Sequence, residues 1–225
     1  GLSRTRSITQ DDAHVFCRYS QIKEEILKIW DIIEKFYGAF GFSLNIRLSL
    51  HDPKQPKKYL GTPKLWKEAE AALRKLINER RADTEEAVGE AAFYGPKIDF
   101  MANDSLGRSW QVATIQLDKN MPDRFDISCI NEKGKSERIA MIHAAIMGSI
   151  ERFLAILIEH FAGSFPLWCA PVQAEIINIG AGQKKYAENL YKKLIDADIR
   201  ATLSDENLTV GKRIREAEIK KIPYI

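Results

Sequence analysis

No apolar run in this 225-residue sequence approaches the roughly 20 residues that a membrane-spanning helix requires. The first residues, GLSRTRSITQDD, also lack the apolar segment of a secretory signal. We therefore expect no membrane partner. Cysteine is scarce: Cys17, Cys129 and Cys169 are odd in number, far apart and without a CxxC pair, which indicates reduced thiols of a cytoplasmic protein.

A large excess of charge of one sign is missing as well. The formal net charge is only +3, so any contact with nucleic acid must depend on local basic patches. With 45% apolar and 29% charged residues, the composition is that of an ordinary globular protein. The length allows one large domain or a domain and a half. Composition alone does not indicate a function.

Apolar residues recur at helical spacing near the middle of the chain and predict a helix that faces the core. They are Ile150, Phe153, Leu154, Leu157, Ile158 and Phe161. Ser149 is placed as an N-cap, and Gly163 as the residue that ends the helix. Arg152 lies off this stripe in the first turn, where the helix dipole favours an anion. The alternative is that Arg152 is a surface residue that forms an ion pair with a Glu.

The remaining patterns predict a largely antiparallel α+β domain followed by a parallel α/β segment. Helices are expected after Ser20 and after Thr62-Pro63, with Ser20 and Thr62 as their N-caps, and the charged stretch 79–90 is expected to be a solvated connection. Strands are expected at residues 8–17, 42–48, 97–101 and 109–118. After a linker at residues 165–171, the expected βαβαβ elements are residues 172–179, 183–197, 199–203, 210–221 and a strand that starts at Ile222.

Polar residues alternate with apolar ones on the first of these strands. Gln10, Asp12 and His14 share one face, which is either a solvated edge or the floor of a site. His14 and His143 fall on two strands that can be neighbours, although two histidines alone do not establish a metal site. After the turn at Gly95-Pro96, Lys97 and Asp99 also share a face.

Four stretches together resemble class II aminoacyl-tRNA synthetases, and in detail the threonyl-tRNA synthetases. They are Arg4–Cys17, Phe93–Phe100, Trp110–Asp118 and the run from His143 to Phe153, which resembles motif 3 of that class. The resemblance implies an antiparallel class II sheet with flanking helices over residues 1–167. It further implies an incomplete α/β (βαβαβ) anticodon-binding domain over residues 168–225.

The resemblance also implies an activity: ATP-dependent activation of L-threonine and its transfer to tRNA(Thr). Arg4 and Arg152 would hold ATP, with Mg²⁺, and Gln111 and Thr114 would line its pocket. The positions expected at the threonine are Gln10, Asp12, Tyr94 and Lys97, the last with an open role. Asn207 would read a base edge of the tRNA, while Lys212, Arg213 and Arg215 would contact phosphates. A homodimer is implied for the full-length enzyme.

In this family, His14 and His143 would bind one Zn²⁺ together with a cysteine from farther upstream. That upstream segment is not in this sequence, and Cys17 points to the strand face opposite His14. A three-ligand zinc with an open position can accept the amino and hydroxyl groups of threonine, which distinguishes it from valine. With two of three ligands, we expect poor zinc affinity for this chain alone.

Some positions depart from the family pattern. Ile8 stands where an aromatic residue usually stacks on adenine, Val112-Ala113 replaces Cys-Gly, and Ala144 replaces an Arg. Because motif 1 and the start of motif 2 are also missing, we expect the chain alone to be inactive. Two alternatives stay open: an impaired synthetase paralogue that only binds tRNA, or a class II synthetase for another small amino acid.

Overall fold

The computed structural model describes residues 1–225. The chain folds into two compact units, Gly1–Ala155 and Ile156–Ile225, and helix α4 (Ile150–Phe161) crosses their boundary. The expected domain boundary at residues 167/168 stays a prediction.

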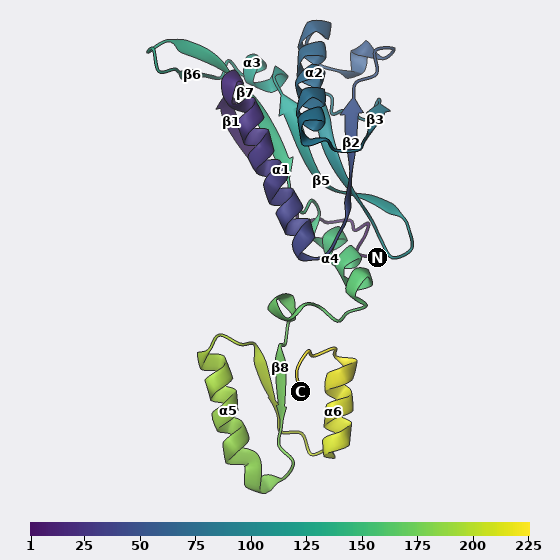
Figure 1. Ribbon diagram of the computed structural model, residues 1–225, viewed down its shortest axis with the longest axis vertical. Coiled ribbons are helices and arrows are strands. Elements are labelled where there is room, and N and C mark those ends of the chain that lie inside the picture. The colour runs from purple at the N-terminus through teal and green to yellow at the C-terminus, as the bar shows by residue number, and fades with distance from the viewer. The chain divides into compact units, whose positions relative to one another are not determined.

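A seven-stranded mixed sheet forms the first unit (Figure 1). Its order is β1-β7-β5-β4-β2-β3, and the short strand β6 pairs with β7. The strands are β1 (Ala13–Arg18), β2 (Leu44–Leu50), β3 (Thr84–Val88), β4 (Lys97–Asn103), β5 (Ser109–Asp118), β6 (Ser128–Ile130) and β7 (Ser136–Ala145). All pairs are antiparallel except β2 with β3, which confirms the expected α+β class.

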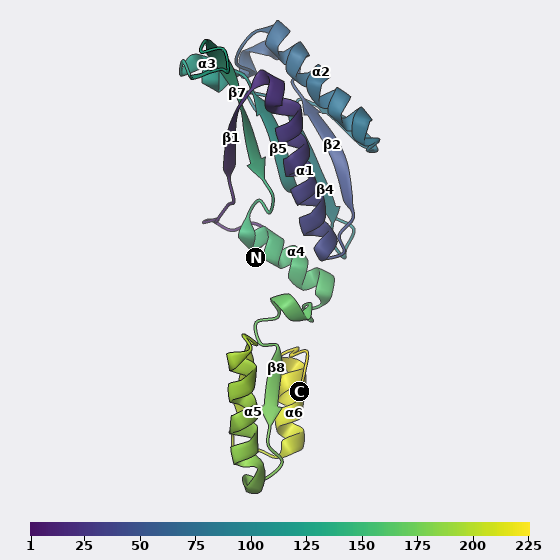
Figure 2. The same ribbon diagram turned by 60° about the vertical axis from the view of Figure 1, so that its left-hand side comes forward.

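Helices α1 (Ile22–Ala39) and α2 (Pro63–Arg80) cover one face of this sheet (Figure 2). Trp30 of α1 packs edge to face on Phe100 of β4, with ring centroids 5.2 Å apart. Fully buried apolar side chains fill the space between these layers: Ile26, Ile33, Leu73, Ile98, Ile115 and Ile142. The alternate residues of the same strands point to the opposite face, which is polar. A short helix, α3 (Asn120–Arg124), follows β5.

The starts of the two long helices differ in how well the sequence predicted them. Thr62 caps α2, because its hydroxyl accepts the Leu65 N–H at 3.3 Å and Pro63 occupies the first turn, as predicted. The predicted Ser20 cap of α1 is wrong. Ser20 lies inside a 3₁₀ turn (Tyr19–Gln21) that leads directly into the helix, so Gln21 takes the cap position without a side-chain bond.

Two further expectations are corrected. The predicted solvated connection contains strand β3, whose backbone pairs with β2 and whose Glu86 forms an ion pair with Arg74 of α2 at 2.7 Å. Charged side chains on an edge strand prevent pairing with other chains, so its sequence does not look like a strand. On α4, Leu154 and Ile158 are 41% and 42% exposed, whereas Ile156 is buried, so the predicted apolar stripe is wrong at these positions.

The second unit has two parallel strands, β8 (Ala174–Ile177) and β9 (Ala201–Ser204), with helices α5 (Lys184–Asp196) and α6 (Val210–Ile219). The expected third strand is reduced to one parallel bridge between Ala174 and Tyr224. The predicted order of elements is otherwise confirmed. No helix in the chain combines the length and apolar character needed to cross a membrane.

The buried layer between α1 and the sheet gives a stability prediction. Ile115→Ala removes a fully buried side chain and should lower the free energy of unfolding by about 2–5 kcal/mol. Ile32→Ala, at a position 52% exposed, is the control and should change it by less than about 0.5 kcal/mol. Urea unfolding followed by tryptophan fluorescence measures both, in a Trp168→Phe background that leaves reporters only in the first unit. Equal midpoints for the two variants would contradict this assignment of the core.

Candidate active site

A row of directly paired residues crosses the polar face of the sheet. Ser49 pairs with Lys97, Lys97 with Gln116, Gln116 with His143, and His143 with His14. Directly opposed residues project to the same face of a sheet, so these side chains line up on one surface. The rings of His14 and His143 have centroids 4.7 Å apart. The fold therefore brings together the two histidines that the sequence separates.

Asp118 holds the ring of His143 in place. Its carboxylate is fully buried, and Oδ2 lies 3.0 Å from His143 Nε2. Oδ1 accepts the backbone N–H groups of Asn120 at 2.8 Å and Met121 at 2.9 Å. An ionised carboxylate only accepts, so this hydrogen bond places a hydrogen on Nε2 of His143 and leaves Nδ1 outside the contact with Asp118. Sequence reasoning missed Asp118, although it follows Gln116 on the same strand face.

Tyr94 packs against His143, with ring centroids 4.7 Å apart and an interplanar angle of 31°. Its hydroxyl donates a hydrogen bond to Gln116 Oε1. Burial raises the pKa of the Tyr94 hydroxyl, and the nearby carboxylates of Asp118 and Asp12 raise it further, so it stays a neutral donor. The next residue is Gly95, where a Cβ would collide with the Leu117 carbonyl, so only glycine lets the turn lie this close to β5.

Asp99 is the second buried carboxylate of this face and is fully shielded from solvent. Its Oδ2 accepts hydrogen bonds from Ser49 Oγ at 2.7 Å, Lys97 Nζ at 2.8 Å and Arg47 Nη2 at 3.2 Å. Its Oδ1 accepts the Thr114 hydroxyl at 2.9 Å. Four donors compensate the burial of one charge, and they fix the Lys97 ammonium group and Thr114 beside the histidine row.

A β-bulge places Gln111 and Thr114 on the same face. In a regular strand, residues three apart point in opposite directions. Here Asp99 pairs with Thr114 while Met101 pairs with Gln111, so Val112 is the extra residue of the bulge. Both predicted ATP-pocket residues therefore project from the polar face of β5.

Arg152, in the first turn of α4, packs over the ring of Trp110 with its Cζ atom 5.4 Å from the ring centroid. Its Nε donates to the Ser3 carbonyl at 3.3 Å. No carboxylate forms an ion pair with it, and Glu151 instead accepts the Thr9 N–H at 3.0 Å. Arg4 is exposed and follows Ser3 directly, so the two predicted arginines come from adjoining segments.

Trp110 is held by a third carboxylate that sequence reasoning missed. Asp104 accepts the indole N–H of Trp110 at 2.8 Å and the backbone N–H groups of Leu106 at 3.0 Å and Arg108 at 2.9 Å. Burial alone would raise the pKa of the Asp104 carboxyl, but these hydrogen bonds, together with that of the Arg108 side chain, lower it to about 2. The hairpin turn that contains Asp104 thus positions the ring beneath Arg152.

The segment before β1 differs from its prediction. Strand β1 begins at Ala13, because the Asp11 carboxylate accepts the backbone N–H groups of Ile146 at 2.6 Å and Met147 at 3.1 Å and so interrupts the expected ladder. Gln10 forms only an isolated bridge with Ser149. Asp12 is exposed, with Oδ1 at 3.9 Å from His14 Nε2. Gln10 and Asp12 therefore lie on irregular backbone, and Asp12 approaches the histidine row at His14.

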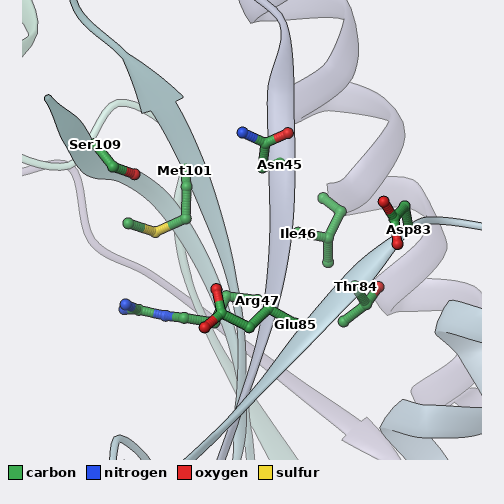
Figure 3. A pocket seen from close by; sticks show the side chains of 8 residues that line it. All are labelled: Asn45, Ile46, Arg47, Asp83, Thr84, Glu85, Met101 and Ser109. Carbon is green, nitrogen blue, oxygen red and sulfur yellow. The ribbon is translucent and has the colours of Figure 1, made fainter. Parts of the chain in front are cut away.

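A pocket of about 580 Å³ lies farther along the sheet, toward the β3 edge (Figure 3). Asn45 and Arg47 of β2, Met101 of β4 and Glu85 of β3 line it. None of the predicted site residues lines this pocket. Arg47 links this pocket to the site, because its Nη2 bonds to Asp99 while its buried Nε has no partner.

In the second unit, Asn207 lines a pocket of about 330 Å³ at the ends of β8 and β9. Lys212 and Arg215 are exposed on α6. Arg213, expected to contact phosphate, is 6% exposed and donates to Asn178 Oδ1 and the Ser204 carbonyl, each at 3.1 Å. It joins α6 to the ends of both strands, so its predicted phosphate role is wrong.

A metal ion would find only part of a ligand set. No group of three His, Cys, Asp or Glu side chains in the chain could hold a metal. His14 and His143 supply two imidazoles side by side, while Cys17 is 5% exposed on the opposite face of β1. The residues therefore fit two positions of a zinc centre that needs at least three protein ligands.

Two known families match this chain, one over each of its two parts. The family profile described as the tRNA synthetase class II core domain (G, H, P, S and T) matches residues 1–161. The chain belongs to the class II tRNA synthetase core family. A second family, described as an anticodon binding domain, matches residues 173–225. Both parts expected from the sequence are confirmed.

Threonine–tRNA ligases are similar to this class II chain over its whole length. The protein from Chlorobium phaeobacteroides is 47% identical and that from Carboxydothermus hydrogenoformans 44% identical, each over 100% of this chain. The chain spans about a third of these relatives, 34% and 35% of their lengths. A structure of the RNA-binding domain of threonyl-tRNA synthetase from Cryptosporidium parvum superposes with a TM-score of 0.93 at 37% identity, covering 100% of this chain and 56% of that one.

The departures from the family pattern lie mostly outside the polar face. Ala144 is 3% exposed and pairs with Ile115, so it belongs to the helix-covered core of this class II sheet. Val112 and Ala113 are also buried, at the bulge. Ile8 is 56% exposed, which leaves its side chain accessible.

The Asp118 contact predicts a single tautomer for His143. Long-range ¹H–¹⁵N spectra should show the Nε2–H form in the native chain. Asp118→Asn should populate the other tautomer, with the hydrogen on Nδ1, because the amide N–H of asparagine can donate to Nε2. Asp12→Asn, which alters a weaker and exposed contact, is the control and should leave His143 unchanged. Identical His143 spectra in all three proteins would contradict the role of Asp118.

The lowered pKa of Asp104 predicts an acid transition at the Trp110 turn. The folded value of about 2 lies below the ordinary 3.8, so the carboxylate stabilises the turn fully above about pH 4. That stabilisation is lost as the pH falls through the folded pKa toward 2. Solvent exchange of the Trp110 indole N–H, followed by NMR, should accelerate over this range. In Asp104→Asn the exchange should show no such step, and a step of equal size there would rule out Asp104 as its cause.

Proposed function

We propose that this chain is part of a threonyl-tRNA synthetase, which activates L-threonine with ATP and transfers it to tRNA(Thr). The observation that carries the proposal is the row of paired residues with two histidines side by side, on a class II sheet. Sequence identity of 44–47% to threonine–tRNA ligases across the whole chain supports it. The activity belongs to the longer protein, because the chain spans about a third of those relatives.

Threonine would bind at the β1 end of the row. Asp12 supplies a carboxylate for its ammonium group, and Gln10 and Tyr94 supply polar contacts. His14 and His143 would hold zinc, with the third ligand from outside these 225 residues. A zinc centre with an open position supplies selectivity, because it accepts the amino and hydroxyl groups that valine cannot both offer. Asp118 keeps Nδ1 of His143 available by occupying Nε2.

ATP would bind beside the threonine, along β5 and the start of α4. Attack of the threonine carboxylate on the α-phosphate releases pyrophosphate, and the protein contributes mainly position and positive charge. Arg152, braced on Trp110, and Arg4 would hold the triphosphate with Mg²⁺. Gln111 and Thr114 line the same face. Lys97, fixed by Asp99, adds a cation to the same face, and its role stays open.

The second unit would contact the tRNA. Asn207 lies in a pocket where an unpaired base can be read by its edge, and exposed Lys212 and Arg215 can reach phosphates. The homodimer and the cytoplasmic location stay predictions.

A paralogue that binds tRNA without forming adenylate is the second candidate. The accessible aliphatic Ile8 at the position of a stacking aromatic favours it. ATP–pyrophosphate exchange separates the two candidates directly. The 225-residue chain alone is expected to show no exchange.

A protein that contains this sequence within a complete catalytic domain should catalyse threonine-dependent ATP–pyrophosphate exchange. Arg152→Ala should slow that exchange about a hundredfold or more, because it removes a charge preorganised for the developing phosphate anion. Lys75→Gln, an exposed lysine on α2, is the control and should keep the native rate. Exchange that runs equally well with valine would contradict threonine recognition. Absence of exchange, with tRNA binding retained, would establish the paralogue.

A further inference from the structure

A small aromatic cavity lies away from the proposed substrate sites, where the loop after β2 meets the start of α2. Its volume is about 130 Å³. His51, Tyr59 and Trp66 line it together with Pro53, Pro56 and Pro63. The Trp66 ring centroid lies 4.9 Å from that of His51 and 5.1 Å from that of Tyr59. The lining is therefore aromatic and apolar, which suits a planar ring more than a charged group.

Hydrogen bonds fix these rings before any ligand arrives. Buried Glu70 accepts the backbone N–H of His51 at 3.1 Å, and its Oε1 lies 2.6 Å from His51 Nδ1. The Trp66 indole N–H donates to the Leu60 carbonyl at 2.7 Å. Tyr59 keeps part of its ring exposed, whereas Trp66 is 3% exposed. A preformed cavity lowers the ordering cost of binding.

The loop that forms one wall of the cavity is basic. Lys54, Lys57 and Lys58 are exposed and alternate along the chain with the lining residues Pro53, Pro56 and Tyr59. Asp52 is the one acidic residue of the loop, and its carboxylate accepts the Lys54 N–H at 2.9 Å and the Gln55 amide at 2.7 Å. An apolar aromatic cavity in a loop with three exposed lysines and one acidic residue is complementary to a nucleotide, whose base is planar and whose phosphate is anionic.

The cavity is connected to the Tyr94 turn of the proposed threonine site. The Leu60 N–H donates to the Phe93 carbonyl at 2.7 Å. Gly61, with φ of +82°, packs directly on Asn120, whose amide donates to the Tyr94 carbonyl at 2.7 Å. A ligand held here would lie beside the segment that carries Tyr94.

We propose that this cavity binds an unpaired nucleotide of RNA, with its base against Tyr59 and its phosphate at Lys57 and Lys58. The inference rests on the proposed function only in taking that RNA to be the substrate tRNA. A proline-rich peptide is the other occupant that such a lining could take, but the excess of exposed lysines in the loop favours a polyanion.

Fluorescence anisotropy of labelled single-stranded hexa-adenylate RNA with the 225-residue chain tests the proposal. Tyr59→Ala should weaken binding about tenfold, whereas Tyr59→Phe, which keeps the ring, should bind as the native chain does. The pair Lys57→Gln, Lys58→Gln should also weaken binding and reduce the salt dependence, by a slope of about 1.4 for two phosphates. The matched pair Lys35→Gln, Lys75→Gln removes the same charge from exposed positions elsewhere. It should change neither the RNA affinity nor its salt dependence.

Native affinity in both Tyr59→Ala and the Lys57, Lys58 pair would overturn the proposal. So would equal loss in the two lysine pairs, which would mean that net charge alone drives binding. A labelled proline decapeptide is titrated in parallel, and Tyr59-dependent binding of the peptide without that of the RNA would also overturn the proposal.

RNA binding in this assay needs neither ATP nor threonine, so a failure of ATP–pyrophosphate exchange leaves this result unaffected. The Tyr59→Phe and lysine variants keep the packing of the rings, so they test the proposal even if Tyr59→Ala misfolds.

Discussion

The register between β1 and β7 sets His14 opposite His143, and the same register continues through Gln116 to Lys97. Side chains alternate along a strand, so a slip of one residue would turn His14 into the helix-covered core. The buried apolar residues of the other face, such as Ile142 and Cys17, resist that slip because it would expose them. Hydrophobic burial on one face thus aligns the polar chemistry on the other.

Buried carboxylates stabilise this polar face from within the sheet. Asp99 and Asp118 are fully shielded from solvent, and each accepts several hydrogen bonds from side chains or backbone. A buried charge without such partners would be strongly destabilising. Because the donors are themselves site residues, the same bonds that satisfy the carboxylates also fix Lys97, Thr114 and His143. These polar groups are therefore held in place without a ligand, so they would need little reorganisation when one binds.

The two units carry different kinds of polar groups, which fit the different ligands proposed for them. The first supplies imidazoles, carboxylates and guanidinium groups suited to a small amino acid and a nucleoside triphosphate. The second supplies a pocket at the ends of parallel strands, with Arg213 joining α6 to those strands and Asn207 in the lining. The cavity at Tyr59 and Trp66 adds an aromatic surface to the first unit, so contacts with RNA need not be confined to the second.

The sequence by itself determined the elements with strong local signals: the Thr62-Pro63 helix start, the alternating strands, the βαβα order and the family to which the motifs belong. It placed His14 and His143 on strands, and Lys97 with Asp99 on one face. Only the tertiary structure decided that Gln111 and Thr114 share a face, because a bulge depends on pairing with β4. It alone revealed Asp118 and Asp104 as supports, that β3 is a strand and that Arg213 is buried. Those features arise from contacts between residues distant in the chain, which local periodicity does not encode.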